Sequence, residues 1–252
     1  MNFKDKRVLI TGSSRGIGQA AAIAFAARGA KVVVHYHRNQ AAGQQTFDSL
    51  KGQEHLLLQA DISDAKAVKS LFQSIQTQLG GIDIVVNNAG IFDPHPIDEV
   101  SYEHWQQSWS QTLATNLIGA ANVCYCATEL MIPNGGGRII NVSSRGAFRG
   151  EPEFPAYGAS KAGMNAMSQS LAKKLGKHNI GVYAIAPGFV ATDMAQPTLD
   201  GPDGNSIKKQ SPLGRVAKPE EVAHAILFYA SEAALFMTGG ILDVNGASYL
   251  RS

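Results

Sequence analysis

The stretch Arg7-Val-Leu-Ile-Thr-Gly-Ser-Ser-Arg-Gly-Ile-Gly18 is the clearest indication of fold class, because it joins a short apolar run to an alanine-rich segment. Residues 7–11 are predicted to form a buried strand, and residues 16–28 a helix that Gly29 ends. The glycines between them have the spacing Gly-x-x-x-Gly-x-Gly, which differs from the common Gly-x-Gly-x-x-Gly. In such a turn the backbone can approach a pyrophosphate, and the helix N-terminus offers unpaired N–H groups. The stretch therefore predicts a nucleotide-binding turn; the alternative is an ordinary glycine-rich connection.

The rest of the chain repeats this alternation of apolar runs and helical segments. Further strands are expected at residues 31–36, 56–60, 82–86, 138–142, 181–186 and 241–244. Helices are expected from residue 63 or 64 to 79, at 101–131 and 155–177, and after Pro219. Strands joined by helices indicate a parallel sheet with right-handed crossovers and helices on both faces. We therefore expect residues 1–252 to form one α/β domain, a doubly wound sheet of about seven strands with ligands at their carboxyl ends.

Composition excludes several classes of protein. Hydrophobic residues make up 44% of the 252 and charged residues 17%, which is typical of a globular core. The net charge of +2 is scattered, so no nucleic-acid surface is expected. No uninterrupted apolar run approaches 18 residues and the start carries no cleavage site, so we expect a cytoplasmic protein with no membrane segment. The two cysteines, Cys124 and Cys126, point in different directions on a helix and support neither a disulfide nor a zinc site.

Residues 193–215 are the most interrupted part of the chain. The breaks come from Pro197, Gly201, Pro202, Gly204, Pro212 and Gly214. This composition predicts an irregular, mobile lid or substrate loop rather than a linker between domains.

A candidate acid/base pair stands in the segment Tyr157-Gly-Ala-Ser-Lys161. Residues four apart share one face of a helix, so the phenol and the ammonium are expected to lie together. A nearby positive charge favours the phenolate and lowers the phenol's pKa from about 10, which suits acid/base chemistry. Ser144 lies upstream, at the end of a predicted strand. The alternative is a surface pair on an ordinary helix.

The end of the second strand, His35-Tyr-His-Arg-Asn39, bears on the choice of nucleotide. No carboxylate stands there to bind ribose hydroxyls and repel a 2′-phosphate. Arg38 and Arg15 could instead pair with such a phosphate, so NADP(H) is favoured over NAD(H). The alternative is that Arg38 lies at an exposed helix start. His35 and His37 lack a third ligand, so no metal site is predicted.

Together these motifs resemble the short-chain dehydrogenase/reductase family. The cofactor turn is similar to residues 11–18, and Asn87-Asn-Ala-Gly90 resembles the family motif after the fourth strand. Asn116 resembles the family's helix asparagine, and the serine thirteen residues before Tyr157 is Ser144, with Ser143 as its competitor. Further similar segments are Pro187-Gly188 with Thr192, Thr238-Gly-Gly, and Val244-Asn-Gly246. The resemblance covers nearly the whole chain and implies a Rossmann domain.

The resemblance also implies residue roles. Tyr157 would be the general acid in reduction and the base in oxidation, and Lys161 would lower its pKa and bind the nicotinamide ribose. Ser144 would hold the substrate oxygen, and Asn116 would hold a water that links Lys161 to solvent. The cofactor-binding set would be Gly12, Ser14, Arg15, Gly16, Ile17, Gly18, Tyr36, Arg38, Asp61, Ile62, Asn88, Ala89, Gly90, Tyr157, Lys161, Pro187, Gly188, Val190 and Thr192. For Asp61 the alternative is a helix cap, and for Thr192 the start of the loop.

The expected function is NADPH-dependent hydride transfer to a small carbonyl substrate or from a secondary alcohol. The layout is most similar to bacterial 3-oxoacyl-[acyl-carrier-protein] reductases, while sugar, steroid and alcohol dehydrogenases share the same segments. A partner as acidic as an acyl carrier should meet a basic patch at the entrance. Other classes considered are a non-catalytic NADP(H)-binding protein and a nucleotide-sugar epimerase. A homotetramer is implied by resemblance, with residues 101–131 and 155–177 packing across a two-fold axis.

Overall fold

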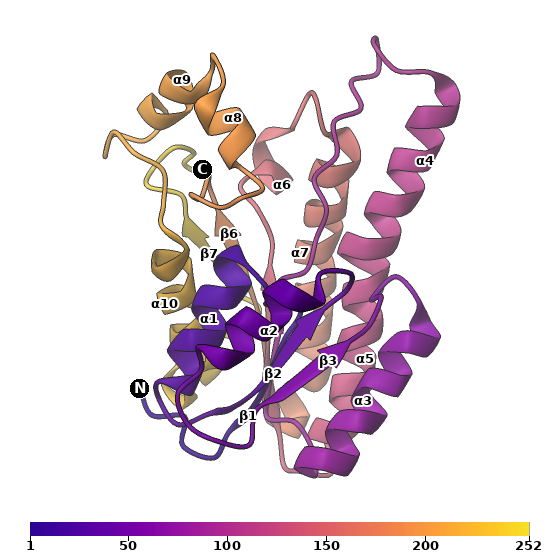
Figure 1. Cartoon of the computed structure of the whole chain (residues 1–252), viewed down its shortest axis with the longest axis vertical. Helices are drawn as coiled ribbons and strands as arrows, with labels where there is room; N and C mark the ends of the chain where they lie inside the picture. Colours follow the sequence, from indigo (N-terminus) through magenta and orange to yellow (C-terminus); the bar gives the residue numbers. More distant parts are fainter. Residues whose placement is uncertain (252) are drawn as a thin grey trace.

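The core of the molecule is a parallel sheet, seen in a computed structural model that describes residues 1–251 (Figure 1). In the described residues its seven strands follow the order β3-β2-β1-β4-β5-β6-β7. The strands are β1 (Arg7–Ile10), β2 (Lys31–Tyr36), β3 (Leu56–Gln59), β4 (Ile84–Asn87), β5 (Gly137–Val142), β6 (Ile180–Pro187) and β7 (Ile241–Val244). The order reverses between β1 and β4, which is where doubly wound sheets bind their ligands. The predicted fold class is confirmed.

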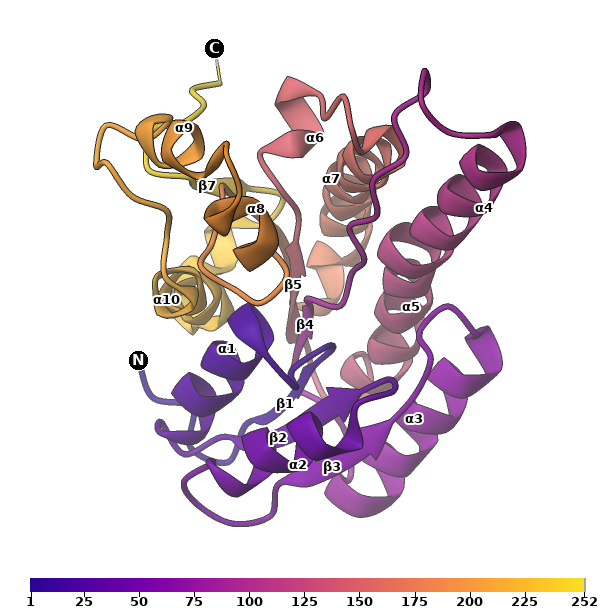
Figure 2. The same ribbon diagram turned by 45° about the horizontal axis from the view of Figure 1, so that its top comes forward.

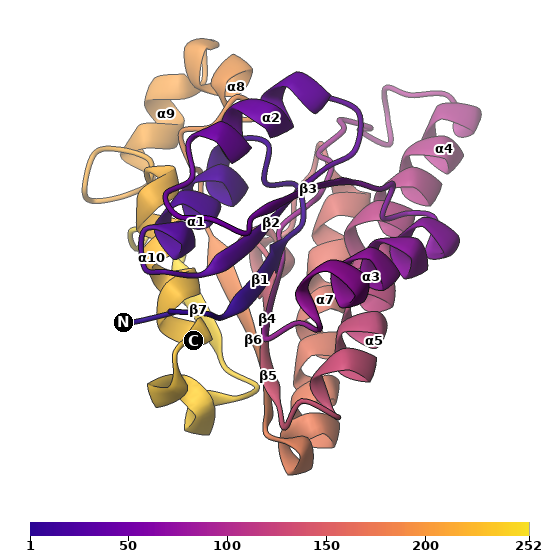
Figure 3. The same cartoon turned by 60° about the horizontal axis from the view of Figure 1, so that its bottom comes forward.

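Helices cover both faces of the sheet because buried strand residues point alternately to either side (Figure 3). Val8 and Ile10 of β1 pack on the side of α1 and α10, whereas Leu9 packs on the side of α3, α5 and α7. The helices are α1 (Gly16–Ala26), α2 (Gln40–Asp48), α3 (Ala65–Leu79), α4 (Tyr102–Leu113), α5 (Ala120–Met131), α6 (Gly146–Arg149), α7 (Pro155–Leu175), α8 (Gln196–Asp200), α9 (Gly204–Lys209) and α10 (Pro219–Ala230). Short 3₁₀ turns follow at η2 (Gly176–His178) and η3 (Glu232–Met237).

The predicted helix at residues 101–131 has the right extent but is not a uniform α-helix. Its middle, η1 (Ala114–Gly119), is a π-helical turn between α4 and α5. Asn116 stands in this turn, and its side chain is fully buried. A π-turn displaces the residues that follow it around the helix axis, and such turns are frequent at functional sites.

Residues 193–215 differ from the predicted irregular loop. They contain α8 and α9, which lie above the carboxyl ends of the strands together with α6 (Figures 1 and 2). Two of the expected breakers stand in first turns, since Pro197 is near the start of α8 and Gly204 is the first residue of α9. Proline fits the first turn of a helix because no backbone N–H is needed there.

Other predictions concern the chain as a whole. No helix of residues 1–251 is long and apolar enough to cross a membrane. Cys124 and Cys126 are both free. The described residues hold no cluster of three potential metal ligands. The cytoplasmic location stays a prediction.

Candidate active site at the carboxyl edge of the sheet

The glycine-rich turn forms a cradle without side chains at the switch point between β1 and β4. Gly12 has φ +64°, and a Cβ there would lie 2.9 Å from the Cα of Ala89. A Cβ on Gly18 would lie 2.5 Å from the carbonyl oxygen of Gly12. The turn leads into α1, whose N-cap residue Arg15 makes no side-chain cap. Close backbone packing and an uncapped helix start fit a nucleotide pyrophosphate.

Asn88 fastens this turn to the strand beside it. Its Nδ2 donates to the carbonyl oxygens of Thr11 (3.0 Å) and Gly12 (3.1 Å). In return, the Thr11 hydroxyl oxygen accepts hydrogen bonds from the backbone N–H groups of Asn88 (3.0 Å) and Ala89 (3.1 Å). The predicted residues at 11–12 and 88–89 are therefore brought together at adjacent strand ends.

His35 is a structural part of the turn and was considered in the sequence only as a metal ligand. Its Nδ1 accepts the Gly12 N–H at 3.0 Å, so the ring proton lies on Nε2, which donates to the Ala60 carbonyl at 3.1 Å. Burial lowers the pKa of His35 to about 4 and keeps the ring neutral. The sequence feature that could have indicated this role is a histidine within a strand of β-branched residues that lies beside the glycine-rich turn.

The two arginines expected to bind a 2′-phosphate come from two turns: Arg15 is the N-cap residue of α1, and Arg38 follows the end of β2. Arg15 and Arg38 are exposed and form no ion pair within residues 1–251. Tyr36 is partly buried, and its ring lies against Gly43 of α2. Two unpaired guanidinium groups fit a 2′-phosphate.

Asp61 is held in a turn before α3, but it is not the helix cap considered as the alternative, because the N-cap of α3 is Asp64. Its carboxylate accepts the N–H (2.9 Å) and the hydroxyl (2.7 Å) of Ser63. Burial tends to raise the pKa of Asp61, but these hydrogen bonds outweigh it and the pKa is lowered. The side chains of Ile62 and Val190 are packed in the core, so only their backbones could face a cofactor.

Tyr157 and Lys161 lie one turn apart at the start of α7, as predicted. Lys161 is 3% exposed, and its Nζ donates to the Val142 carbonyl at 2.7 Å. Burial lowers the pKa of Lys161 to about 8. Burial also raises the pKa of Tyr157 to about 12, against the opposing effect of Ser144. The lowering by Lys161 expected from the sequence is not seen, because its Nζ is 5.6 Å from the phenol ring centre and burial dominates.

Ser143 and Ser144 are adjacent in the chain but differ in burial and in hydrogen-bond partners. Ser143 is buried, and its hydroxyl donates to the Lys161 carbonyl at 3.3 Å. Ser144 is partly exposed, accepts the Gly146 N–H at 3.0 Å and lies next to the phenol of Tyr157. Of the two serines, Ser144 is therefore the one beside the phenol, and its contact with a substrate oxygen stays a prediction.

Asn116 reaches from the π-turn to the loop after β4. Its Oδ1 accepts the Ile91 N–H at 2.8 Å, and its Nδ2 donates to the Ile91 carbonyl at 3.0 Å. A Cβ on Gly90 would lie 3.2 Å from Asn116 Oδ1 and 3.7 Å from Lys161 Nζ. Asn116 thus lies near Lys161, but its amide already binds backbone; the proton relay through water stays a prediction.

The segment after β6 closes the site from the opposite side. A Cβ on Gly16 would lie 3.1 Å from the Thr192 methyl group, so this segment covers the glycine-rich turn. Pro187 accepts the Arg145 N–H at 2.9 Å, and Gly188 donates to the Val244 carbonyl at 3.1 Å. Thr192 therefore lies against the glycine-rich turn, whereas Pro187 and Gly188 bond to Arg145 and to β7; contact of this segment with the nicotinamide stays a prediction.

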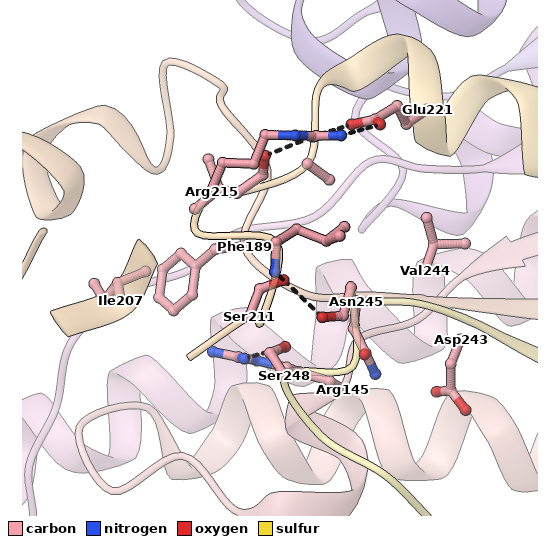
Figure 4. A pocket seen from close by; sticks show the side chains of 14 residues that line it. Arg145, Phe189, Ile207, Ser211, Arg215, Glu221, Asp243, Val244, Asn245 and Ser248 are labelled. Carbon is pink, nitrogen blue, oxygen red and sulfur yellow. Dashed lines mark hydrogen bonds and ion pairs between the residues drawn. The ribbon is translucent and has the colours of Figure 1, made fainter. Parts of the chain in front are cut away.

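A cavity of about 150 Å³ is lined in part by Ile207, Ser211 and Arg215, which belong to residues 193–215 (Figure 4). Arg145, next to Ser144 in the chain, is 3% exposed and lines it. Its guanidinium donates to Gln210 Oε1 at 2.6 Å and to the Ser248 hydroxyl at 2.5 Å. Arg145, which no sequence motif indicated, joins residues 193–215 to the C-terminal segment through Gln210 and Ser248.

Comparison with known proteins supports one family. The family model described as enoyl-(acyl carrier protein) reductase matches residues 12–247. A 3-oxoacyl-[acyl-carrier-protein] reductase of Chlamydia trachomatis is 39% identical over 245 residues, which cover 96% of both chains. A D-threitol dehydrogenase of Mycolicibacterium smegmatis is 35% identical over 243 residues, 96% of this chain and 92% of that protein.

A solved structure agrees with these relatives. A protein of Sinorhizobium meliloti described as a short-chain alcohol dehydrogenase matches with a TM-score of 0.91 and 33% identity, over 98% of this chain and 97% of that one. The resemblance inferred from the motifs is confirmed. The chain belongs to the short-chain dehydrogenase/reductase family of NAD(P)(H)-dependent oxidoreductases.

Proposed function

We propose that this enzyme uses NADP(H) to interconvert a carbonyl compound and a secondary alcohol, with Tyr157 as its general acid/base. The observation that carries the proposal is the meeting of Tyr157, Lys161 and Ser144 beside the glycine-rich turn. The bound nicotinamide would supply or accept the hydride.

The raised pKa of Tyr157 keeps the phenol protonated and ready to donate to a carbonyl oxygen. The Ser144 hydroxyl would hold the same oxygen beside the phenol. Lys161 Nζ uses one donor on Val142, which leaves donors for ribose hydroxyls. In the direction of oxidation the phenol must first lose its proton, so a raised pKa favours reduction near neutral pH.

The preference for NADP(H) rests on Arg15 and Arg38. Parallel titrations with NADPH and NADH test it, followed by the same titrations on R38A. We expect tighter binding of NADPH, with the preference weakened by about tenfold or more in R38A, since a charged hydrogen bond contributes about 1.5–3 kcal/mol. Equal affinities, or a preference for NADH, would contradict the proposal. K6A, which removes a cation distant from β2's end, is the control.

Relatives suggest two classes of substrate, a carrier-linked 3-oxoacyl thioester and a free sugar alcohol. We propose the thioester first, because the family match and the relative of highest identity above both name acyl-carrier-linked chemistry. One observation favours the free substrate. Residues 91–104, which lead from β4 into α4, contain four acidic residues and no lysine or arginine, so this segment offers no basic patch to an acidic carrier.

Kinetics at several salt concentrations separate these two classes. A carrier-linked substrate preferred over the free thioester, with kcat/KM falling as salt rises, would support carrier recognition. Equal kcat/KM for both forms and no salt effect would exclude it. Turnover of free polyols with NADP⁺ would then support the second class.

A further inference from the structure

The loop between β4 and α4 contains a histidine that is fully buried beside the start of the Tyr157 helix. His95 is 0% exposed, and its backbone N–H donates to the Glu153 carbonyl at 2.8 Å. The ring Nδ1 lies 2.8 Å from the Asp93 carbonyl, and Nε2 lies 3.1 Å from the Ala156 backbone nitrogen. A carbonyl can only accept and an N–H can only donate. The ring is therefore neutral, with its proton on Nδ1 and Nε2 as an acceptor.

His95 Nε2 supplies a hydrogen-bond acceptor that the N-terminus of α7 lacks. The N-cap residue Phe154 makes no side-chain cap, and Pro155 has no N–H to bond. Ala156 thus offers the first N–H of the helix, and His95 binds it from a different loop. The next residue is Tyr157, so this hydrogen bond fixes the turn from which the phenol projects.

Aromatic contacts place the rest of the loop against the same turn. Phe92 stacks on Phe154 at 3.6 Å between ring centres and meets the Tyr157 ring edge-on at 4.8 Å. The His95 ring itself packs edge-on against Trp105 of α4 at 5.6 Å. Rings on both sides hold the imidazole and the first turn of α7 in one arrangement.

We propose that His95 is a positioning residue for the proposed reaction: its neutral ring caps α7 at Ala156 and holds Tyr157 in the orientation that proton transfer needs. His95 is fully buried and so offers no exposed atom to a substrate or cofactor. The inference rests on the proposed function, because positioning matters only if Tyr157 transfers a proton. General acid catalysis is sensitive to displacement of the acid by as little as 1 Å.

Two amide substitutions of His95 test its hydrogen bonds to Ala156 and to Asp93 separately. In H95Q, the longer side chain carries its amide to the place of Nε2 and can accept the Ala156 N–H. In H95N, the amide lies at the place of Nδ1 and can only reach Asp93. We expect H95Q to keep most of the wild-type kcat, and H95N to lose about tenfold or more in kcat with KM and the Kd for NADPH unchanged. Equal kcat in the two variants would overturn the proposal, as would a loss that follows their melting temperatures.

Measurements on the wild-type chain keep the inference testable if the variants fold poorly. The ¹⁵N chemical shifts of the His95 ring should show the Nδ1–H tautomer, and the Ala156 amide should exchange slowly for a residue in a first helical turn. An Nε2–H tautomer or fast exchange would refute the cap. Absence of any carbonyl turnover by the wild type would instead refute the proposed function. The His95 tautomer and the Ala156 exchange rate would still test whether His95 caps α7.

Discussion

The phenol of Tyr157 and the amine of Lys161 are affected by burial in opposite directions. Burial raises the pKa of Tyr157 to about 12 and lowers that of Lys161 to about 8. Both shifts favour the uncharged forms, because a charge is poorly solvated there. The site is therefore prepared with a proton on the phenol, which is the state that reduction of a carbonyl requires.

Substitution of Tyr157 by phenylalanine should lower kcat far more than it weakens cofactor binding. Y157F keeps the ring and its edge contact with Phe92 but has no hydroxyl. We expect kcat to fall by about 10²-fold to 10⁴-fold, the usual contribution of a general acid, and the Kd for NADPH to rise by at most about tenfold, the loss of one hydrogen bond. Steady-state kinetics and a fluorescence titration measure the two quantities. The exposed Tyr102, changed to Phe, is the control. A Y157F enzyme with near-normal kcat would assign the acid to another group.

His35 should make stability depend on pH. In the unfolded chain its pKa returns to about 6.5, whereas folding lowers it to about 4. The unfolded state therefore binds the extra proton first, and stability is lost as pH falls from about 6.5 to about 4, by about 3 kcal/mol. Urea unfolding at several pH values measures this loss. H35N, whose Oδ1 can accept the Gly12 N–H but does not titrate, should show a smaller loss. An identical loss in H35N would assign the pH dependence to other groups.

At the scale of elements, the π-turn η1 connects the long helix formed by α4 and α5 to the loop after β4. It turns Asn116 toward Ile91, where one amide satisfies a backbone N–H and a carbonyl. N116A leaves both groups without this partner, so we expect the free energy of unfolding to fall by about 2 kcal/mol. Urea denaturation measures it, and N122A, on the partly exposed side of α5, should change little. Equal effects of the two substitutions would contradict this role of Asn116.

The elements that the sequence predicted best are those with a strong local pattern. The strands at residues 31–36 and 241–244 have the predicted bounds because β-branched and apolar runs stop at polar or glycine residues. Helix α2 was missed because Gln40–Asp48 has no apolar periodicity; Asn39 caps it, and packing on β2 and β3 holds it. The π-turn was missed because its residue Asn116 bonds the distant backbone of Ile91, and no spacing inside the helix encodes that contact.

The candidate site was predictable to a similar degree. Tyr157, Lys161 and Ser144 lie together because one helix and one strand end position them. His95 and Arg145 were missed because each acts on segments distant in sequence: His95 bonds Ala156, and Arg145 bonds Gln210 and Ser248. The pKa of Tyr157 also required the fold, because burial depends on packing around the whole cleft.

At the scale of the whole molecule, several large apolar side chains of the described residues are exposed, among them pairs on two separate elements. Tyr125 on α5 and Ile118 in the π-turn are 67% and 54% exposed. At η3, beside β7, Phe236 is fully exposed and Met237 is 47% exposed. Large apolar side chains gathered on a surface usually mark interfaces. We propose the homotetramer implied by the family, with α4–α5 and α7 at one two-fold interface and η3 with β7 at another.

Two different two-fold interfaces make a tetramer that should come apart in steps. Y125E places a charge in the first interface and F236E in the second, so each is expected to give dimers, because the other interface survives. The double variant should sediment as a monomer. Sedimentation velocity measures the mass, and far-UV circular dichroism shows that the fold is kept. E129Q, which removes a charge from the same helix as Tyr125, is the control and should remain a tetramer. Tetramers in both single variants would exclude these surfaces as interfaces, and a wild-type monomer would exclude the assembly itself.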